Sequence, residues 1–190
     1  MKKKLSTNIK LIQISKDLFW KHGIKRITVE EICKEAEVSK MTFYRYFKNK
    51  EAVAIAVIET IFNESLERYH NIMSTNDTFR IKVNKLLKLK QDDIKGISQE
   101  FIKDISRSDS STLRDIIEDF RKQMHQHILL DFKKAQDKGD IRQDLNLDFV
   151  IFLLNDLNEK LFDEHLIKMY PSQEALIMEL TNHFFYGILT

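Results

Sequence analysis

The 190-residue chain contains little proline, glycine or cysteine. One Pro and four Gly are far fewer than the roughly 12% that these two residues make up in an average protein, which disfavours a turn-rich β-sandwich or barrel. The single cysteine, Cys33, allows neither an internal disulfide nor a multi-cysteine zinc site, so a disulfide-stapled secreted scaffold is excluded. Cys33 fits a small buried apolar residue better than a redox sensor. The composition favours long helices in a reducing compartment.

Long apolar runs are also missing. The charge-free stretch near residues 149–155 is much shorter than the roughly 18–20 residues that cross a bilayer. Polar and charged residues also interrupt the region after Met1 where a signal peptide would need an apolar core. We therefore expect a soluble, cytoplasmic protein with no membrane partner.

The charges of the chain are unevenly distributed. Residues 1–50 hold 13 Lys and Arg and five Asp and Glu, a net charge of +8, whereas residues 51–190 hold 18 and 24, a net charge of −6. A basic first part indicates contact with a polyanion, and the acidic remainder indicates a separate task. The cut at Lys50 predicts two domains, a polyanion-binding domain over 1–50 and a domain with a different task over 51–190.

Apolar residues recur at helical spacing along most of the chain. Thr28 and Glu31 form the capping-box pattern of a helix start, and Ser39 is placed to cap a short helix that follows after a three-residue turn. Two short helices joined in this way form a helix-turn-helix unit. We predict an all-α fold of about nine helices, a three-helix N-terminal domain and a helical C-terminal domain, with helices over 8–22, from 28, 40–47, 50–73, 78–93, 97–106, 111–138, 146–168 and 173–189.

One continuous segment carries a family signature. The run from Thr28 to Glu51, TVEEICKEAEVSKMTFYRYFKNKE, resembles the signature of the tetracycline-repressor (TetR) family of bacterial transcription regulators. With the preceding Ile14-Ser15-x-x-Leu18-Phe19-x-x-x-Gly23 pattern, the resemblance covers about residues 9–55. One departure is Glu37, which stands where the family commonly has glycine in the interhelical turn, and a non-glycine residue in a left-handed turn costs about 1 kcal/mol.

A recognition helix places polar or small residues against DNA bases and keeps its other face apolar. Lys40 or Arg45 fits guanine, and the methyl groups of Met41 and Thr42 fit the thymine methyl. Other residues are expected to contact phosphates and so position the helix: Thr28, Tyr44, Tyr46, Lys48 and Lys50, with Lys25 and Arg26 before the second helix. The alternatives are that the tyrosines are core residues and that the lysines are only solvated.

The resemblance implies a helix-turn-helix DNA-binding domain over 1–50 and a helical effector-binding and dimerisation domain over 51–190. It also implies a small-molecule effector held between middle helices of the C-terminal domain. Candidate pocket residues combine aromatic walls with a polar anchor: Tyr69, Phe101, Phe120, Met124 and Asn155. Core packing is the alternative for each of them. The acidic balance of this part favours a cationic or neutral lipophilic effector over an anion.

The last two long helices have more apolar residues than one core face requires. The resemblance implies that such helices pair with those of a second copy, and the resulting homodimer places two recognition helices on a palindromic operator. The expected interface residues are Phe152, Leu154, Leu157, Leu161, Phe184, Phe185 and Ile188. The alternative is that they only close the monomer core.

Signatures of catalysis and cofactor binding are missing from the sequence. It has no G-x-S-x-G motif and no glycine-rich phosphate loop. Its six histidines are scattered without cysteine partners, so we expect no metal, no cofactor and no enzyme activity. The favoured interpretation is a repressor released by an effector. A same-fold DNA-binding protein controlled by a protein or by no ligand, and a helical enzyme or adaptor, stay open.

Overall fold

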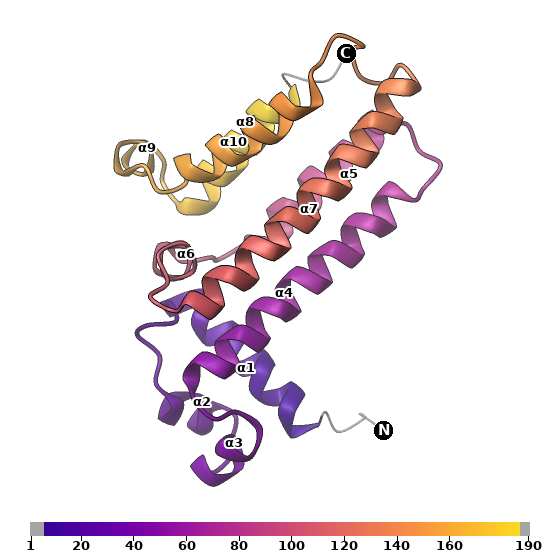
Figure 1. The fold of residues 1–190 in the computed structure, drawn as a ribbon. Coiled ribbons are helices and arrows are strands. Elements are labelled where there is room, and N and C mark those ends of the chain that lie inside the picture. Colours follow the sequence, from indigo (N-terminus) through magenta and orange to yellow (C-terminus); the bar gives the residue numbers. More distant parts are fainter. Residues whose placement is uncertain (1–5, 187–190) are drawn as a thin grey trace. The chain divides into compact units, whose positions relative to one another are not determined.

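The structure is a computed structural model that describes residues 6–186. These residues form ten α-helices, shown in Figure 1. The predicted all-α fold is confirmed. The helices are α1 Thr7–His22, α2 Val29–Glu35, α3 Lys40–Tyr46, α4 Lys50–Met73, α5 Phe79–Asp93, α6 Gln99–Ser106, α7 Ser111–Asp137, α8 Leu147–Lys160, α9 Glu164–Met169 and α10 Gln173–Tyr186.

Side-chain caps fix the beginnings of the three N-terminal helices. Ser6, Thr28 and Ser39 are the N-caps of α1, α2 and α3, and each side chain accepts a hydrogen bond from a backbone N–H in the first turn. At α2 the capping box is complete, because Glu31 Oε2 accepts the Thr28 N–H at 2.8 Å. The predicted helix starts follow from this local chemistry.

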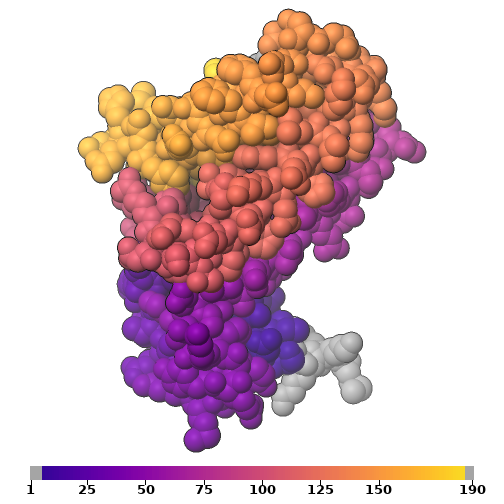
Figure 2. Space-filling model, viewed as in Figure 1, coloured from indigo at the N-terminus to yellow at the C-terminus, as the bar shows by residue number. Residues whose placement is uncertain are grey.

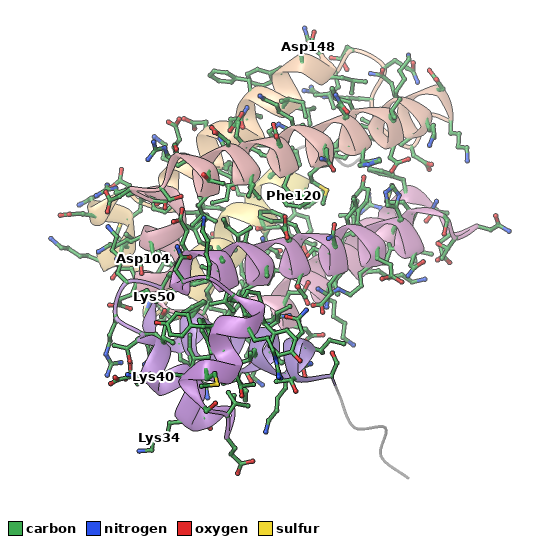
Figure 3. The ribbon with its side chains drawn as sticks, turned by 60° about the horizontal axis from the view of Figure 1, so that its bottom comes forward. Lys34, Lys40, Lys50, Asp104, Phe120 and Asp148 are labelled. Carbon is green, nitrogen blue, oxygen red and sulfur yellow. The ribbon has the colours of Figure 1, made fainter. Side chains whose placement is uncertain are left out.

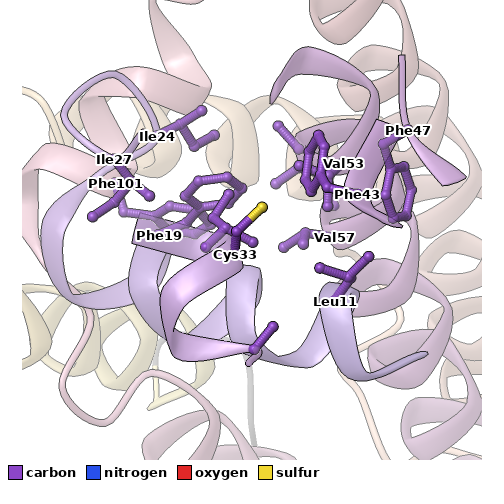
Figure 4. Packing of buried hydrophobic residues seen from close by; sticks show 14 of the residues in the cluster. Leu11, Phe19, Ile24, Ile27, Cys33, Phe43, Phe47, Val53, Val57 and Phe101 are labelled. Carbon is purple, nitrogen blue, oxygen red and sulfur yellow. The ribbon is translucent and has the colours of Figure 1, made fainter. Parts of the chain in front are cut away.

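The chain divides into two compact units, and the first contains the N-terminal helices. It comprises the described residues up to Glu64 and Gly96–Glu118. Figure 4 shows part of its core, in which apolar side chains from several helices meet. They include Phe19 of α1, Cys33 of α2, Phe43 of α3, Val57 of α4 and Phe101 of α6. Cys33 is buried as predicted, and burial raises the pKa of its thiol.

The second unit comprises Ser65–Lys95 and the described residues from Asp119 onward. Its core joins α5, α7, α8 and α10. Phe132 lies edge-on to Phe79, with ring centroids 5.3 Å apart, and also contacts Phe184. Helix α10 therefore packs against α5 and α7 within this unit.

The two compact units do not coincide with a division at Lys50. The first turns of α4 supply Val53 and Val57 to the first core, and Phe101 and Leu113 join the same core from α6 and α7. Helices α4 and α7 thus contribute residues to both units. The division of function at Lys50 stays a prediction.

The prediction of one helix over 146–168 is wrong. Helix α8 ends at Lys160, and the Asp163 carboxylate accepts hydrogen bonds from the His165 and Leu166 amides, which begins α9. A competing N-cap therefore interrupts the apolar stripe. This break raises the number of helices in residues 6–186 from the predicted nine to ten. Among the described helices, none combines the length and the apolar character that a membrane span requires.

Candidate nucleic-acid interface

The turn between α2 and α3 sets the placement of α3. Glu37 has a φ of 54°, in the left-handed region. Its amide donates to the Lys34 carbonyl and the Val38 amide donates to the Cys33 carbonyl, at 3.1 and 3.0 Å. This is the Schellman arrangement that ends many helices, with glutamate at the position where glycine is usual. The departure noted in the sequence is accommodated without a change in the type of turn.

Helix α3 has one apolar face and one exposed face. Phe43 is fully buried, and its ring centroid lies 5.8 Å from that of the buried Phe47. On the opposite side Met41 is 84% exposed and Tyr44 is 54% exposed, and Arg45 is exposed as well. The purple surface at the lower end of Figure 2 includes the helix-turn-helix of α2 and α3. The exposed face of α3 is therefore open to a partner, as a recognition helix requires.

Lys40 is exposed but carries an ion pair. Its ammonium donates to the Glu30 carboxylate in the first turn of α2, and this bond raises the pKa of Lys40. Figure 3 shows Lys40 at the end of the unit where Lys34 also lies. To reach a base, Lys40 must exchange Glu30 for the DNA.

Thr42 and Tyr46 have partners on or beside α3. The Thr42 hydroxyl lies 3.0 Å from the Ser39 hydroxyl, and Thr42 is only half-exposed. The Arg45 guanidinium lies over the Tyr46 ring, 5.2 Å from its centroid. Met41 and Arg45 are thus better exposed for base contact than Thr42 is.

Thr28 and Lys48 differ in whether the side chain is engaged in hydrogen bonds within the protein. Both are exposed, but the Thr28 hydroxyl takes part in the capping box. The hydrogen bonds from the Thr28 backbone and side chain lower the pKa of Glu31. Lys48 directly follows α3 and its C-cap Phe47.

Lys50 is placed differently from the expected phosphate contact. Its ammonium donates to the carbonyls of Ile24, Lys25 and Ile27 at 2.8, 2.9 and 2.7 Å. An ammonium has three N–H donors, and all three are used here. Partial burial lowers the pKa of Lys50, against the opposing effect of the Asp104 carboxylate.

Lys25 and Arg26 lie in the loop between α1 and α2. The Lys25 ammonium forms an ion pair with Asp109 at 2.9 Å, and this bond raises the pKa of Lys25. The Lys25 amide donates to Asp104 Oδ2 at 2.8 Å. Arg26 is exposed. The loop therefore carries two cationic side chains on a backbone that is bound by Asp104 at an amide and by Lys50 at its carbonyls.

Comparison with known proteins agrees with this geometry. Residues 11–57 match the family of bacterial regulatory proteins described as the tetR family. The chain carries the N-terminal domain of the TetR family. The resemblance seen in Thr28–Glu51 is thereby confirmed, and this domain includes the helix-turn-helix of α2 and α3.

Proteins that resemble the N-terminal part of this chain are described as transcriptional regulators. The uncharacterized HTH-type transcriptional regulator YuxN of Bacillus subtilis is 32% identical over 77 residues, which are 40% of this chain and 26% of YuxN. The match thus spans about a quarter of that relative. Its description as a regulator agrees with the expectation that the chain is not an enzyme.

Solved structures share the fold of the whole chain. Regulatory protein TetR from Rhodobacter sphaeroides superposes with a TM-score of 0.79 at 16% identity, covering 96% of this chain and 99% of that one. A protein from Saccharomonospora viridis, solved in complex with choline, gives 0.76 at 17% identity, covering 96% and 97%. These likenesses establish the TetR-like fold beyond the N-terminal domain.

The residues predicted for an effector pocket are divided between the two units. Phe101 belongs to the core of the first unit, where its ring centroid lies 5.2 Å from that of Trp20. The other four lie in the second unit, where Tyr69 is buried and donates to Asp131 Oδ2 at 3.1 Å. Burial, followed by the Asp131 charge, raises the pKa of Tyr69. Phe120, Met124 and Asn155 are half-buried.

The residues predicted for a dimer interface have unequal exposure. Phe152 of α8 is 63% exposed and stacks on the exposed Phe149, with ring centroids 6.0 Å apart. Phe184 is buried in the core of the second unit. Half-buried residues complete the described part of the set, namely Leu154, Leu157, Leu161 and Phe185, and Ile188 lies outside the described residues.

Three carboxylates of this site have no signal in the sequence. Glu30 pairs with the Lys40 ammonium. Asp104 accepts a hydrogen bond from the Lys25 amide, and Asp109 pairs with the Lys25 ammonium. The two aspartates are separated by about 80 residues from the loop that they contact, so no local spacing indicates them. Within residues 6–186 no three His, Cys, Asp or Glu side chains are gathered as metal ligands.

Proposed function

We propose that this protein is a transcriptional regulator that binds a palindromic DNA operator as a homodimer. The observation that carries the proposal is the exposed face of α3, which is polar or flexible on the outside and anchored by Phe43 on the inside. The match to the TetR-family domain supports the same conclusion. Such a regulator acts in the cytoplasm, where bacterial DNA is found.

The geometry supports separate base-contacting and phosphate-contacting residues on this surface. Met41 and Arg45 are exposed on α3 and serve base contact, Arg45 as a donor to guanine and Met41 against a thymine methyl. Lys48 and Arg26 are exposed cations beside the helix-turn-helix and serve phosphate contact. Tyr44, Thr28 and Lys25 are exposed and join the phosphate set. Lys40 joins the base-reading set after it leaves Glu30.

Two copies pair through the exposed side of α8 in this proposal. Phe149 and Phe152 form a stacked apolar pair, and large apolar side chains of this exposure mark interaction surfaces. A two-fold dimer presents two α3 helices to two half-sites of one operator. Other predicted interface residues are partly buried and pack against the core of the second unit, namely Leu154, Leu157 and Phe185.

A small molecule releases the protein from DNA in the favoured form of this proposal. The residues after Lys50 carry a net charge of −6. The Asp131 carboxylate lies beside the Tyr69 ring, a combination that suits a cation once it displaces the Lys134 ammonium, which pairs with Asp131 at 2.9 Å. A structural neighbour was solved in complex with choline, which is a cation. The effector is therefore proposed to be cationic or neutral and lipophilic, and its action is repression relieved by binding.

A gel-shift titration with the DNA upstream of the protein's own gene tests the proposal. We expect a specific complex that a scrambled duplex does not form. We also expect it to weaken steeply with salt, because each neutralised phosphate contributes about 0.9 to the slope of log affinity against log salt. Equal affinity for both duplexes would contradict the proposal. Adding cationic and anionic compounds to the complex then tests the effector, since release only by anions would overturn its proposed class.

A further inference from the structure

The loop between α1 and α2 is held at its carbonyl groups by the partly buried ammonium of Lys50. Lys50 Nζ lies 2.8 Å from the Ile24 carbonyl, 2.9 Å from the Lys25 carbonyl and 2.7 Å from the Ile27 carbonyl. Charge-assisted hydrogen bonds of this kind are stronger than neutral ones. Three of them within four residues fix the course of the backbone from residue 24 to residue 27.

The same loop is held at an amide by α6. Asp104 Oδ2 accepts the Lys25 N–H at 2.8 Å, and Figure 3 shows Asp104 close to Lys50. The approach is tight at Gly23, where an added Cβ would lie 2.8 Å from Asp104 Oδ2 and 2.9 Å from Glu100 Cβ. The Ser98 amide also donates to the Trp20 carbonyl at 2.9 Å. Helix α6 therefore contacts the loop and the helix that precedes it.

We infer that Lys50 and Asp104 are positioning residues for DNA binding. The loop that they hold carries the exposed Arg26 and leads directly into Thr28, the N-cap of α2. Arg26 and Thr28 both belong to the proposed phosphate-contacting set, so the inference rests on the proposed function. Lys50 acts through the backbone of the loop and not on a phosphate, because its three donors are already bound.

Whether Asp104→Asn raises or lowers the DNA affinity distinguishes a positioning role from simple charge repulsion. A carboxylate near a DNA-binding surface repels phosphate, so its removal by Asp104→Asn strengthens binding if charge alone matters. If Asp104 positions the loop, the same substitution removes a charged acceptor from the Lys25 amide and weakens binding. We expect DNA affinity to fall about 5- to 30-fold, the equivalent of one to two kcal/mol.

Asp109→Asn is the matched control. Asp109 carries the same charge in the same unit, but it contacts the Lys25 side chain instead of the backbone. Its removal frees the Lys25 ammonium for phosphate, so we expect DNA affinity to be unchanged or higher. Weakening by Asp104→Asn together with no weakening by Asp109→Asn supports the inference. Equal effects of the two substitutions would overturn it.

A double-mutant cycle with Lys50→Met tests whether the two residues act on one loop. Residues that share a network give non-additive effects, so the double variant is expected to bind about as weakly as Lys50→Met alone. If Lys50 contacts phosphate directly, the single substitutions instead act independently and their effects add. Additive effects would therefore contradict the inference. Asp104→Asn stands as the test even if Lys50→Met fails to fold.

Hydrogen exchange separates this inference from the proposed function. The Lys25 amide is expected to exchange faster in Asp104→Asn, whereas the Phe43 amide inside α3 keeps its protection. If the wild-type protein binds no DNA, the proposed function fails, and exchange at Lys25 still reports whether Asp104 holds the loop. Unchanged protection of Lys25 in Asp104→Asn would overturn the positioning role.

Discussion

Glu37 adopts a left-handed backbone conformation, with a φ of 54°, that glycine tolerates far better than glutamate. Replacing Glu37 with glycine is expected to raise the free energy of unfolding by about 0.5–1 kcal/mol, the removed strain less the added freedom of the unfolded chain. Urea denaturation measures this change as a higher midpoint at constant slope.

Glu37→Ala is the control for this substitution. It keeps the Cβ and therefore the strain, but removes the carboxylate that pairs with Lys10 at 3.4 Å. An ion pair this exposed contributes little, so Glu37→Ala is expected to lie within about 0.5 kcal/mol of the wild type. Equal stabilisation by both variants would assign the effect to charge and not to the backbone.

The capping-box carboxylate of Glu31 makes stability depend on pH. Its pKa lies below the ordinary 4.5 because Thr28 donates backbone and side-chain hydrogen bonds to it. A group with a lowered pKa in the folded state stabilises the protein above its unfolded-state pKa and loses this effect as the pH falls through its folded-state pKa. The advantage of the wild type over Glu31→Gln is thus expected to shrink below pH 4.5. A difference that stays constant down to pH 3 in urea denaturation would be the contrary result.

Residues with nearby partners were predictable from sequence, and residues with distant partners were not. The Thr28–Glu31 box spans three positions, so its spacing is visible in the chain. Lys50 instead bonds to a loop about 25 positions earlier, and its expected phosphate contact was based on motif position alone. Sequence spacing does not indicate which of two acceptors, carbonyl or phosphate, an ammonium will meet after folding.

At the scale of the element, a capping side chain divided one predicted helix into two. The apolar stripe over 146–168 predicts one helix, but the Asp163 side chain accepts the His165 and Leu166 amides and begins α9. The bounds of the other predicted helices that lie within residues 6–186 agree with the structure to within about two residues, and the predicted end at 189 lies outside the described residues. Hydrophobic periodicity alone does not reveal a competing cap inside a long stripe.

Asp163→Ala tests the role of this cap. Losing an N-cap carboxylate costs about 1 kcal/mol, so α9 is expected to fray and the His165 and Leu166 amides to exchange faster. Asp156→Ala is the control, since Asp156 is a carboxylate within α8 that pairs with Lys160 at 3.9 Å and caps no helix start. Equal exchange of the two amides in both variants would show that Asp163 is not what begins the helix.

At the scale of the whole molecule, the sequence predicted the fold but not the division into units. The low glycine and proline content and the apolar spacing indicate the all-α architecture. The contribution of Phe101 and Leu113 to the first core depends on packing between residues far apart in the chain. The expected effector pocket included Phe101 for its aromatic character, and the structure uses that ring in the core instead.

Phe152 tests the proposed homodimer. A charge at the exposed stacked pair removes an apolar contact and leaves an unpaired carboxylate in the interface, so Phe152→Asp is expected to raise the dimer dissociation constant about 30-fold or more. Sedimentation equilibrium measures this constant. Leu130→Asp is the control, because Leu130 of α7 is similarly exposed at 60% and lies outside the proposed interface. A dimer that survives Phe152→Asp unchanged would place the contact elsewhere.

The measurement that most directly tests DNA reading by α3 is selection of binding sites from random duplexes. We expect the wild-type protein to enrich a palindromic sequence that binds two chains per duplex. Arg45→Ala is expected to lose preference at specific base positions, whereas Lys48→Ala is expected to keep the sequence and to lower the salt slope by about 0.9. No enrichment by the wild-type protein, or an identical sequence selected by Arg45→Ala, would contradict the account.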